Sequence, residues 1–370
     1  MIRAPWARFA TVVTLIGSML SALPALAVTT FNDGAVHDVS AAIDQIEVLD
    51  GPGSVPTTVN VLPGAVVGAG QTSFSVNVRD TSIFNMSGGS LFDELFLFNN
   101  SSAHLTGGSI GDDLTPDNNA TVLVTSVTVN DDVEAHGASS ITINGGSFDE
   151  DVESLDSAVI TINGGTFQTG TDAANVSASG SSVINIHAGT FGAGTTTGSG
   201  GFNVIDNAVI NFYGGDIAKQ TAGLNASGNG VINVFGLGSQ PASVNVSASG
   251  VINFYEGALQ NLTTNGSGLV RLLGTDGSLN NLSAQGTTEI RIVGKNFAAF
   301  NGAVPLAYGL IPYGSGNLTG VLADGTSITN VPFIRNIVGG AQIRLVPEPA
   351  SFAIVLLPLV GVMVQRRRCG

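Results

Sequence analysis

The chain has 370 residues, a net charge of −15, 50 glycines and only twelve lysines and arginines. A nucleic-acid-binding surface needs clustered cations, so this charge balance excludes nucleic acid as a partner. Cys369 is the single cysteine, which excludes an intrachain disulfide and a cysteine-based metal site. The abundance of glycine and the scarcity of charge favour a repeated β architecture over helices.

Residues 1–27 have the organisation of a secretory signal peptide. Two arginines precede an apolar run over residues 10–23, and Ala25-Leu26-Ala27 forms a cleavage site of the A-x-A type. The run is short for a membrane span, which needs roughly 20 apolar residues. A membrane anchor is therefore the weaker alternative. We expect a mature chain that begins near Val28, outside the cytoplasm.

A repeat marked by Gly-Gly pairs fills the middle of the chain. Four successive intervals have the same length, about 19 residues, and the later ones vary around or above it, as is typical of solenoids whose loops vary on a fixed frame. With the second glycine of each pair, or its equivalent, as the mark, the repeat falls at Gly64, Gly89, Gly108, Val127, Gly146, Gly165, Gly189, Gly215, Leu237, Gly257, Thr275 and Lys295.

Around each mark, apolar residues alternate with polar ones. They occupy the positions three and five before the mark, as in Ile141 and Ile143, and two after it, as in Phe148. A period of two in short β-branched segments predicts strands with one buried face. One coil cannot bury that face alone, but stacked coils can.

We therefore predict an all-β fold, a right-handed parallel β-helix or β-solenoid, over residues 64–295. It should contain about twelve coils of roughly 19–26 residues and be about 60 Å long. A β-sandwich or an array of small β domains is the alternative, but neither explains why the interval stays constant from Gly89 to Gly165.

Both ends of a solenoid expose strand edges and need caps. Residues 28–63 are expected to supply the N-terminal cap and the first strand. The period breaks after Lys295, and residues 318–326 predict a strand followed by a tight turn. We expect residues 296–345 to form a small C-terminal β cap.

Acidic pairs follow four consecutive marks, four and five residues after each. Their spacing predicts a carboxylate ladder on one edge of the stack, where like charges repel. An oxygen-rich edge without cysteine suits Ca²⁺ better than a transition metal, and no other cofactor is indicated. The alternative is a solvated acidic face that blocks edge pairing. The ladder comprises Asp93, Glu94, Asp112, Asp113, Asp131, Asp132, Glu150 and Asp151.

A polar and aromatic column is expected on the outside of the later coils. Exposed aromatic rings beside amides could hold sugar rings. The alternative is a ladder of rings stacked on one another and covered by a neighbouring loop. Asparagine recurs four residues before the marks, at Asn185, Asn211, Asn233 and Asn253, and aromatic residues recur two before them, at Tyr213, Phe235 and Tyr255.

Signatures of catalysis are weak. The four histidines show no zinc-binding spacing, and the chain has no nucleophile elbow or P-loop. Some parallel β-helices are polysaccharide lyases or hydrolases, whose sites need carboxylates beside a base or a second acid in a cleft. His104 and His136, the only candidate bases near the acidic pairs, are interpreted as ordinary surface histidines. We predict no catalytic residue.

The C-terminus carries three features in order. An apolar run over residues 352–364 is short for a permanent span and contains Pro358, which indicates a transient membrane stop. Positive residues beyond such a run stay cytoplasmic, so the bulk of the chain lies on the other side. The run follows Val346, Pro347, Glu348 and Pro349, and it precedes Arg366, Arg367 and Arg368.

Residues 346–370 resemble the PEP-CTERM sorting signal of bacterial exported proteins. The resemblance implies that an exosortase-type membrane enzyme recognises Pro347-Glu348-Pro349 and removes the apolar tail. The product would pass to the cell envelope or to an extracellular polysaccharide matrix. Proteins with this signal are associated with exopolysaccharide and biofilm production.

Together these features predict an exported, surface- or matrix-associated solenoid with a structural or adhesive role. Its expected partners are the exosortase-type enzyme, extracellular polysaccharide and, transiently, the membrane. A secreted polysaccharide-degrading β-helix enzyme is the alternative. A third possibility, a calcium-binding adhesin, depends on the acidic ladder.

Overall fold

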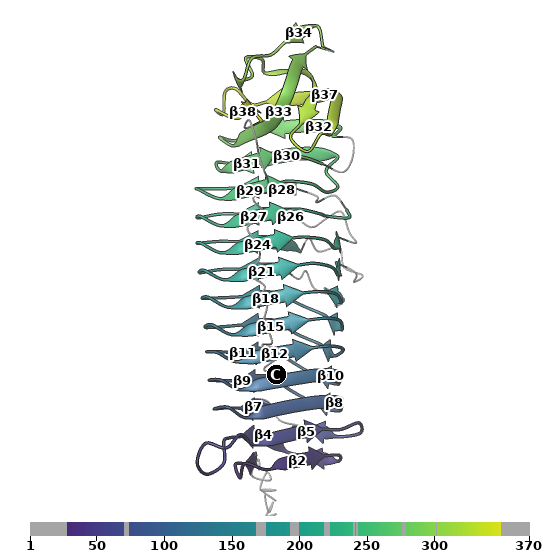
Figure 1. The fold of residues 1–370 in the computed structure, drawn as a ribbon, viewed down its shortest axis with the longest axis vertical. Coiled ribbons are helices and arrows are strands. Elements are labelled where there is room, and N and C mark those ends of the chain that lie inside the picture. Colours follow the sequence, from purple (N-terminus) through teal and green to yellow (C-terminus); the bar gives the residue numbers. More distant parts are fainter. Residues whose placement is uncertain are drawn as a thin grey trace, which may run out of the picture.

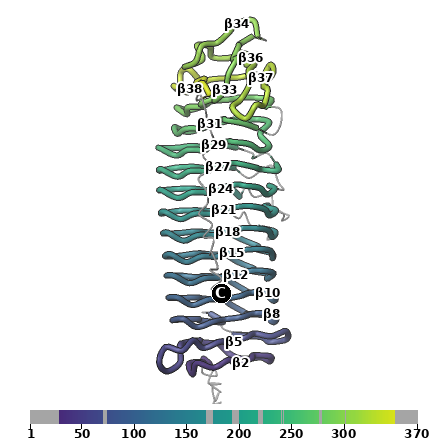
Figure 2. Tube along the Cα trace, in the orientation of Figure 1, coloured from purple at the N-terminus to yellow at the C-terminus, as the bar shows by residue number. Residues whose placement is uncertain are grey.

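A computed structural model describes residues 28–69, 74–167, 175–192, 200–217, 223–239, 241, 243–275, 279–300 and 302–348. These ranges contain 38 strands and no helix, and hence none long and apolar enough to cross a membrane. The strands stack into a β-solenoid of about twelve coils (Figure 1). The chain advances along the rod from the purple first coil to the yellow-green cap (Figure 2). The predicted β-solenoid is confirmed.

Each coil contributes strands to faces that run the length of the rod, named face 1, face 2 and face 3 in chain order. Within a face, strands of successive coils pair in parallel. Face 1 contains β1 (Val28–Phe31), β4 (Gln45–Val48), β7 (Val76–Val78), β9 (Leu95–Leu97), β11 (Leu114–Pro116), β14 (Val133–Ala135), β17 (Val152–Ser154), β20 (Val176–Ala178), β23 (Gly201–Val204), β26 (Gly223–Ala226), β28 (Ser243–Val246), β30 (Asn261–Gly266), β32 (Asn281–Ala284) and β37 (Ser327–Arg335).

The other two faces follow the same rule, and two long strands bend through both of them. Face 2 contains β2 (Val36–Val39), β5 (Thr58–Val61), β8 (Ile83–Leu91), β10 (Ser102–Ile110), β12 (Thr121–Val124), β15 (Ser140–Ile143), β18 (Val159–Ile162), β21 (Val183–Ile186), β24 (Val209–Phe212), β27 (Val231–Val234), β29 (Val251–Phe254), β31 (Leu269–Leu272), β33 (Glu289–Ala299) and β38 (Gln342–Pro347). Face 3 contains the last residues of β8 and β10 with β3 (Ala42–Ile43), β6 (Val66–Val67), β13 (Thr128–Val129), β16 (Ser147–Phe148), β19 (Thr166–Phe167), β22 (Thr190–Phe191) and β25 (Asp216–Ile217).

The core consists of equivalent residues stacked in register. On face 2, Ile141 lies opposite Ile160, and Ile160 lies opposite Ile184, with all three buried. On face 3, the rings of Phe148, Phe167 and Phe191 stack with centroids 4.8 Å apart. The positions predicted from the period of two are therefore the core positions, and each buried side chain stabilises the fold by about 1.5–3 kcal/mol.

The repeat marks are the corner between faces 2 and 3. Gly146 and Gly165 adopt φ values of +121° and +111°, which disfavour any residue with a Cβ atom. A Cβ atom on Gly146 would lie 2.6 Å from the carbonyl oxygen of Val127 in the preceding coil. The Gly-Gly pairs thus turn the chain where coils approach each other closely.

A second corner, between faces 1 and 2, uses left-handed backbone at asparagine and aspartate. Asn118 and Asp156 have φ values of 59° and 55°, and these short polar residues tolerate that conformation best after glycine. The carboxylate of Asp156 also accepts a hydrogen bond from the backbone N–H of Gly137 in the coil below, at 3.1 Å. The left-handed conformation of these two residues was not predicted from the sequence.

The C-terminal end carries the expected small β cap. β36 (Ser315–Leu322) pairs antiparallel with β33 and β37. β34 (Val304–Pro305) and β35 (Gly309–Leu310) pair antiparallel with β33 and β38. β37 and β38 then return to pair in parallel with β32 and β33. At the other end, parallel pairing already includes β1, whose Val28 lies opposite Gln45.

Removal of one ring from the buried stack should destabilise the rod. Phe167→Ala leaves a cavity between Phe148 and Phe191, which we expect to lower the free energy of unfolding by about 3–5 kcal/mol. Urea denaturation followed by circular dichroism measures the change. Phe92→Ala, at a position 56 % exposed, is the matched control. Equal denaturation midpoints for the two variants would contradict the packing described here.

Candidate functional site

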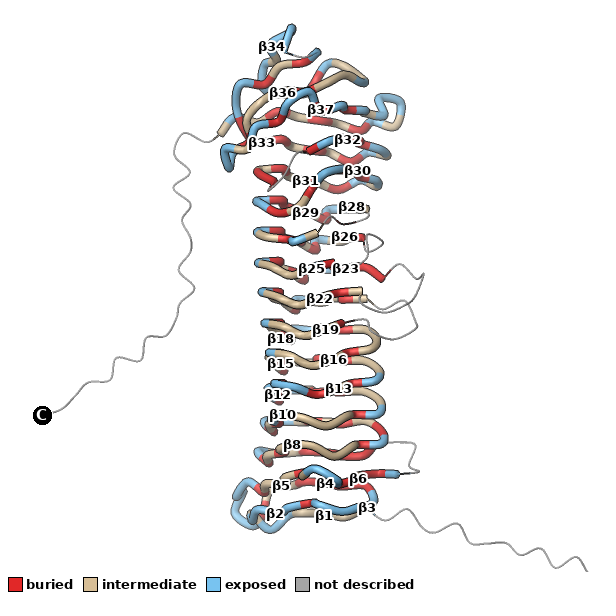
Figure 3. The backbone as a smooth tube through the Cα atoms, turned by 90° about the vertical axis from the view of Figure 1, so that its right-hand side faces the viewer, coloured by how far each residue is buried: buried red, intermediate tan, exposed pale blue. Residues whose placement is uncertain are grey.

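The acidic pairs occupy the corner between faces 3 and 1, where the chain turns after β8, β10, β13 and β16 (Figure 3). The parallel register stacks them into two columns. The first column contains Asp93, Asp112, Asp131 and Glu150, and the second contains Glu94, Asp113, Asp132 and Asp151.

The second column joins neighbouring coils. The backbone N–H of Asp132 donates to Oδ1 of Asp113 at 2.9 Å, and the N–H of Asp151 donates to Oδ1 of Asp132 at 2.8 Å. The N–H of Asn175 likewise donates to Oδ1 of Asp151. Each of these carboxylates therefore satisfies a backbone donor of the coil above, which gives the column a structural role.

Carboxylate oxygens from the two columns also lie close together. One oxygen each from Asp112, Asp113 and Asp131 lie within 4.8 Å of one another, and so do oxygens of Asp131, Asp132 and Glu150. Asp93, at the N-terminal end of the column, is only 9 % exposed, and its Oδ2 accepts no hydrogen bond from the described residues. These oxygens face other acceptors, so a proton or a cation is needed to relieve their repulsion.

Burial and mutual repulsion raise the pKa values of these carboxyl groups. Burial is the main cause for Glu94 and Asp131, whose pKa values rise to about 7, with contributions from Asp113 and Asp112 respectively. The pKa of Asp113 rises to about 6, again mainly through burial. Part of the ladder therefore retains protons near neutral pH when no cation is bound.

Two further glutamates extend the acidic surface onto face 1, and neither was predicted from the sequence. Glu134 and Glu153 lie opposite each other on β14 and β17, at outward positions. Burial raises the pKa of Glu153, and the charge of Asp151 adds to the effect. The two glutamates are separated by one repeat interval, and that separation was the available signal.

The two candidate bases lie in different places. Half-buried His136 has its Nε2 atom 3.2 Å from a carboxylate oxygen of Glu134. His104 is exposed on β10, in the part of that strand that belongs to face 2. The fold does not place His104 at the acidic corner.

The predicted aromatic column is present and stacks on itself. Tyr213 and Phe235 have ring centroids 5.1 Å apart and planes 6° apart, and Phe235 and Tyr255 are 4.7 Å and 10° apart. His187, which was not among the predicted members, stacks on Tyr213 at 4.7 Å. The rings of Tyr213 and Phe235 are covered on both faces, so they present mainly their edges to solvent.

Two asparagine ladders run along the rod. The predicted ladder on face 2 is hydrogen-bonded: Asn211 donates to Asn185 and Asn233 donates to Asn211, both at 2.9 Å. A second ladder on face 1 was not predicted, although Asn203, Asn225 and Asn245 recur at the same intervals of 22 and 20 residues as Asn211, Asn233 and Asn253. It joins Asn175, Asn203, Asn225 and Asn245 at 2.8–3.2 Å.

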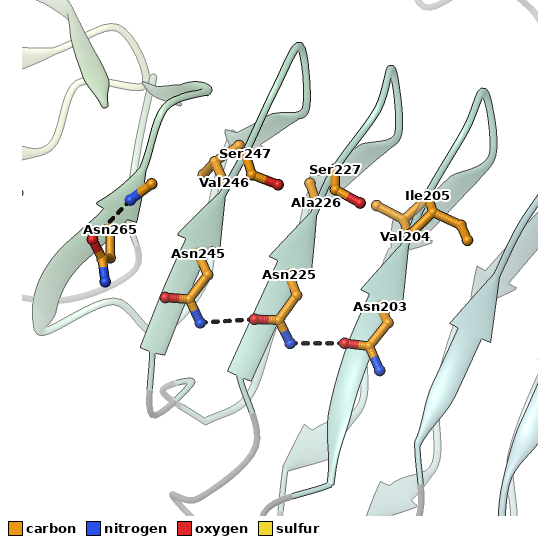
Figure 4. A pocket seen from close by; sticks show the side chains of 11 residues that line it. Asn203, Val204, Ile205, Asn225, Ala226, Ser227, Asn245, Val246, Ser247 and Asn265 are labelled. Atoms are coloured by element: carbon orange, nitrogen blue, oxygen red, sulfur yellow. Dashed lines mark hydrogen bonds between the residues drawn. The ribbon is translucent and has the colours of Figure 1, made fainter. Parts of the chain in front are cut away.

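An open groove of about 490 Å³ follows the face 1 ladder. Figure 4 shows the amides of Asn203, Asn225 and Asn245 aligned across neighbouring strands, with Ile205 and the Ser227 and Ser247 hydroxyls beyond them. Its lining is amide, hydroxyl and aliphatic, without a carboxylate or a histidine. The groove therefore offers hydrogen bonds and apolar contacts to a ligand.

The predicted processing residues fall mostly outside the described ranges. Ala25, Ala27, Pro349 and the arginines at 366–368 lie outside them. Val346 and Pro347 end β38, and the carboxylate of Glu348 lies 3.3 Å from the ammonium group of Lys295. This exposed ion pair holds the start of the motif only weakly against the cap.

Comparison of the chain with protein-family models, curated proteins and solved structures finds no match. Function is therefore inferred from the residues of this chain.

The raised pKa values predict that stability falls as pH rises. The same carboxyls titrate near pH 4 in an unfolded chain, roughly, but near 6 to 7 in the fold. Between these pH values the folded state holds more protons than the unfolded chain. The stabilisation that the protonated carboxyl groups give the fold is therefore complete below about pH 4, and it is lost as pH rises through the folded pKa values. With a chelator present, we expect a melting temperature roughly 5 °C lower at about pH 8 than at about pH 5.

The double variant Glu94→Gln/Asp131→Asn should flatten this pH dependence, because it removes the two carboxyls whose pKa values rise to about 7. Asp44→Asn removes an exposed charge from the first coil and should leave the dependence unchanged. Melting temperatures that are equal at both pH values, or higher at the alkaline one, would show that the ladder does not titrate as described.

Proposed function

We propose that this chain is an exported β-solenoid with a structural or adhesive role at the cell surface or in an extracellular polysaccharide matrix. An exosortase-type membrane enzyme would process its C-terminal signal, and extracellular polysaccharide would be its ligand. The resemblance of residues 346–370 to a PEP-CTERM signal and the signal-peptide pattern of residues 1–27 support export and sorting.

The observation that carries the proposed adhesive role is the repetition of hydrogen-bonding groups along the rod. Within the face 1 ladder, the amide of Asn225 donates one N–H to Asn203 and accepts one from Asn245, which leaves a second donor and a second acceptor for a ligand. A polysaccharide is also a repeat of donors and acceptors. Contacts with several coils would act together, which raises the overall affinity well above that of one contact.

The groove on face 1 is the best-supported place for such a chain. It combines the amides of Asn203, Asn225 and Asn245 with the aliphatic side chain of Ile205, which is 45 % exposed. The aromatic column is the less favourable place, because Tyr213 and Phe235 are stacked on both faces. Sugar rings would have to meet the edges of those rings.

The intact mass of the native protein, recovered from its producing cells, tests the proposal of export and sorting. We expect a product that begins near Val28 and ends near Pro347-Glu348-Pro349, with or without added glycan mass. A product that retains Arg366 to Arg368 would mean that the tail serves as an anchor, and the proposed sorting would fail.

Co-sedimentation with the extracellular polysaccharide of the producing cells tests the adhesive role. We expect Asn225→Ala/Asn245→Ala to weaken binding roughly tenfold, because each good hydrogen bond contributes about 0.5–1.5 kcal/mol. The control is Thr142→Ala/Thr161→Ala, at equivalent outward positions on face 2. Unchanged binding by the asparagine variant, with its melting temperature preserved, would remove face 1 from the proposed binding surface.

A further inference from the structure

We propose that the acidic corner binds divalent cations, Ca²⁺ above all, at two neighbouring sites that share Asp131. The first site is formed by Asp112, Asp113 and Asp131, and the second by Asp131, Asp132 and Glu150. This binding activity goes beyond the proposed structural role and does not depend on it.

The geometry and chemistry of each group suit Ca²⁺. Each offers three carboxylate oxygens within 4.8 Å of one another from half-buried residues. Ca²⁺ takes six to eight oxygen ligands in a flexible arrangement, and water can supply those that the protein does not. Mg²⁺ demands a tighter octahedron and keeps more of its water, so it should bind more weakly.

The second column holds part of each site in place. Oδ1 of Asp113 and Oδ1 of Asp132 are each held by a backbone N–H of the next coil, at 2.9 and 2.8 Å. Both carboxylates keep a second oxygen for a cation. Hydrogen bonds of this kind orient metal ligands before the ion arrives.

Asp93 gives an independent indication that the column lacks a positively charged partner. Its side chain is 9 % exposed, Oδ2 accepts no hydrogen bond from the described residues, and its carboxyl group contacts that of Asp112. An unsatisfied buried carboxylate oxygen is costly. A cation at the first site would offset the negative charge of Asp112. The repulsion between the carboxylates of Asp112 and Asp93 would then be weaker.

The shared ligand determines the expected stoichiometry. Both sites need Asp131, and two dications on adjacent coils would repel each other across about 5 Å. We expect one Ca²⁺ to bind per chain, followed by a second with at least tenfold lower affinity.

Isothermal titration of the full chain with CaCl₂, at about pH 8 and about 0.15 M NaCl, tests the inference. Wild-type chain should bind with a dissociation constant between about 10⁻⁵ and 10⁻³ M. Asp131→Asn should weaken binding at least tenfold, because it removes the ligand common to both sites. Asp44→Asn removes the same charge at an exposed position of the first coil and should bind as the wild type does.

Thermal melting separates loss of the site from loss of the fold. Ca²⁺ should raise the melting temperature of the wild type and of Asp44→Asn but not that of Asp131→Asn. In chelator, Asp131→Asn should melt at or above the wild-type temperature, because it removes a like charge from the column. If that variant does not fold, Asp112→Asn, which belongs to the first site alone, takes its place.

Two outcomes would overturn the inference. One is the absence of both heat and a melting shift for the wild type up to about 10 mM Ca²⁺. The other is equal binding by the wild type and Asp131→Asn, which would mean diffuse attraction of counterions to an acidic surface. Because neither experiment involves export or polysaccharide, a negative result leaves the proposed function to its own tests.

Discussion

Parallel stacking in register is the constraint on which the rest of this molecule depends. Each coil places a residue directly over its equivalent in the coil below, so every column is a contact between similar side chains. Isoleucines, phenylalanines and asparagines gain from this arrangement through packing, ring stacking and amide hydrogen bonds. Carboxylates do not. The same register that assembles the core around Phe167 also forces Asp112 and Asp131 together.

Much of this arrangement could be predicted because two periods determine it. The period of two sets which side chains face inward, and the repeat interval sets which residues meet across coils. The buried isoleucine and phenylalanine columns, the face 2 asparagine ladder and the acidic ladder all followed from these periods. The glycine corner also followed, because a residue such as Gly146 is fixed in phase with the strands beside it.

The face 1 asparagine ladder could also have been found from these periods but was missed, because Asn203 and Asn225 are 22 residues apart, as Asn211 and Asn233 are. Other features could not be predicted from the periods. Composition could not distinguish the two members of an acidic pair. Only the backbone geometry shows which member of a pair accepts an N–H from the coil above, as Asp113 does. The aromatic column was placed correctly, but whether its rings stacked or lay open depended on side-chain rotamers.

The described chain begins in the first coil and ends in the cap, so its two ends lie at opposite ends of the rod (Figure 1). If the C-terminal end were attached to a surface, the position of each feature along the rod would determine its distance from that surface. The asparagine groove between Asn203 and Gly266 would stand nearer that surface, and the acidic corner would stand farther out. Each added coil would lift the acidic corner by about 4.8 Å without changing its chemistry.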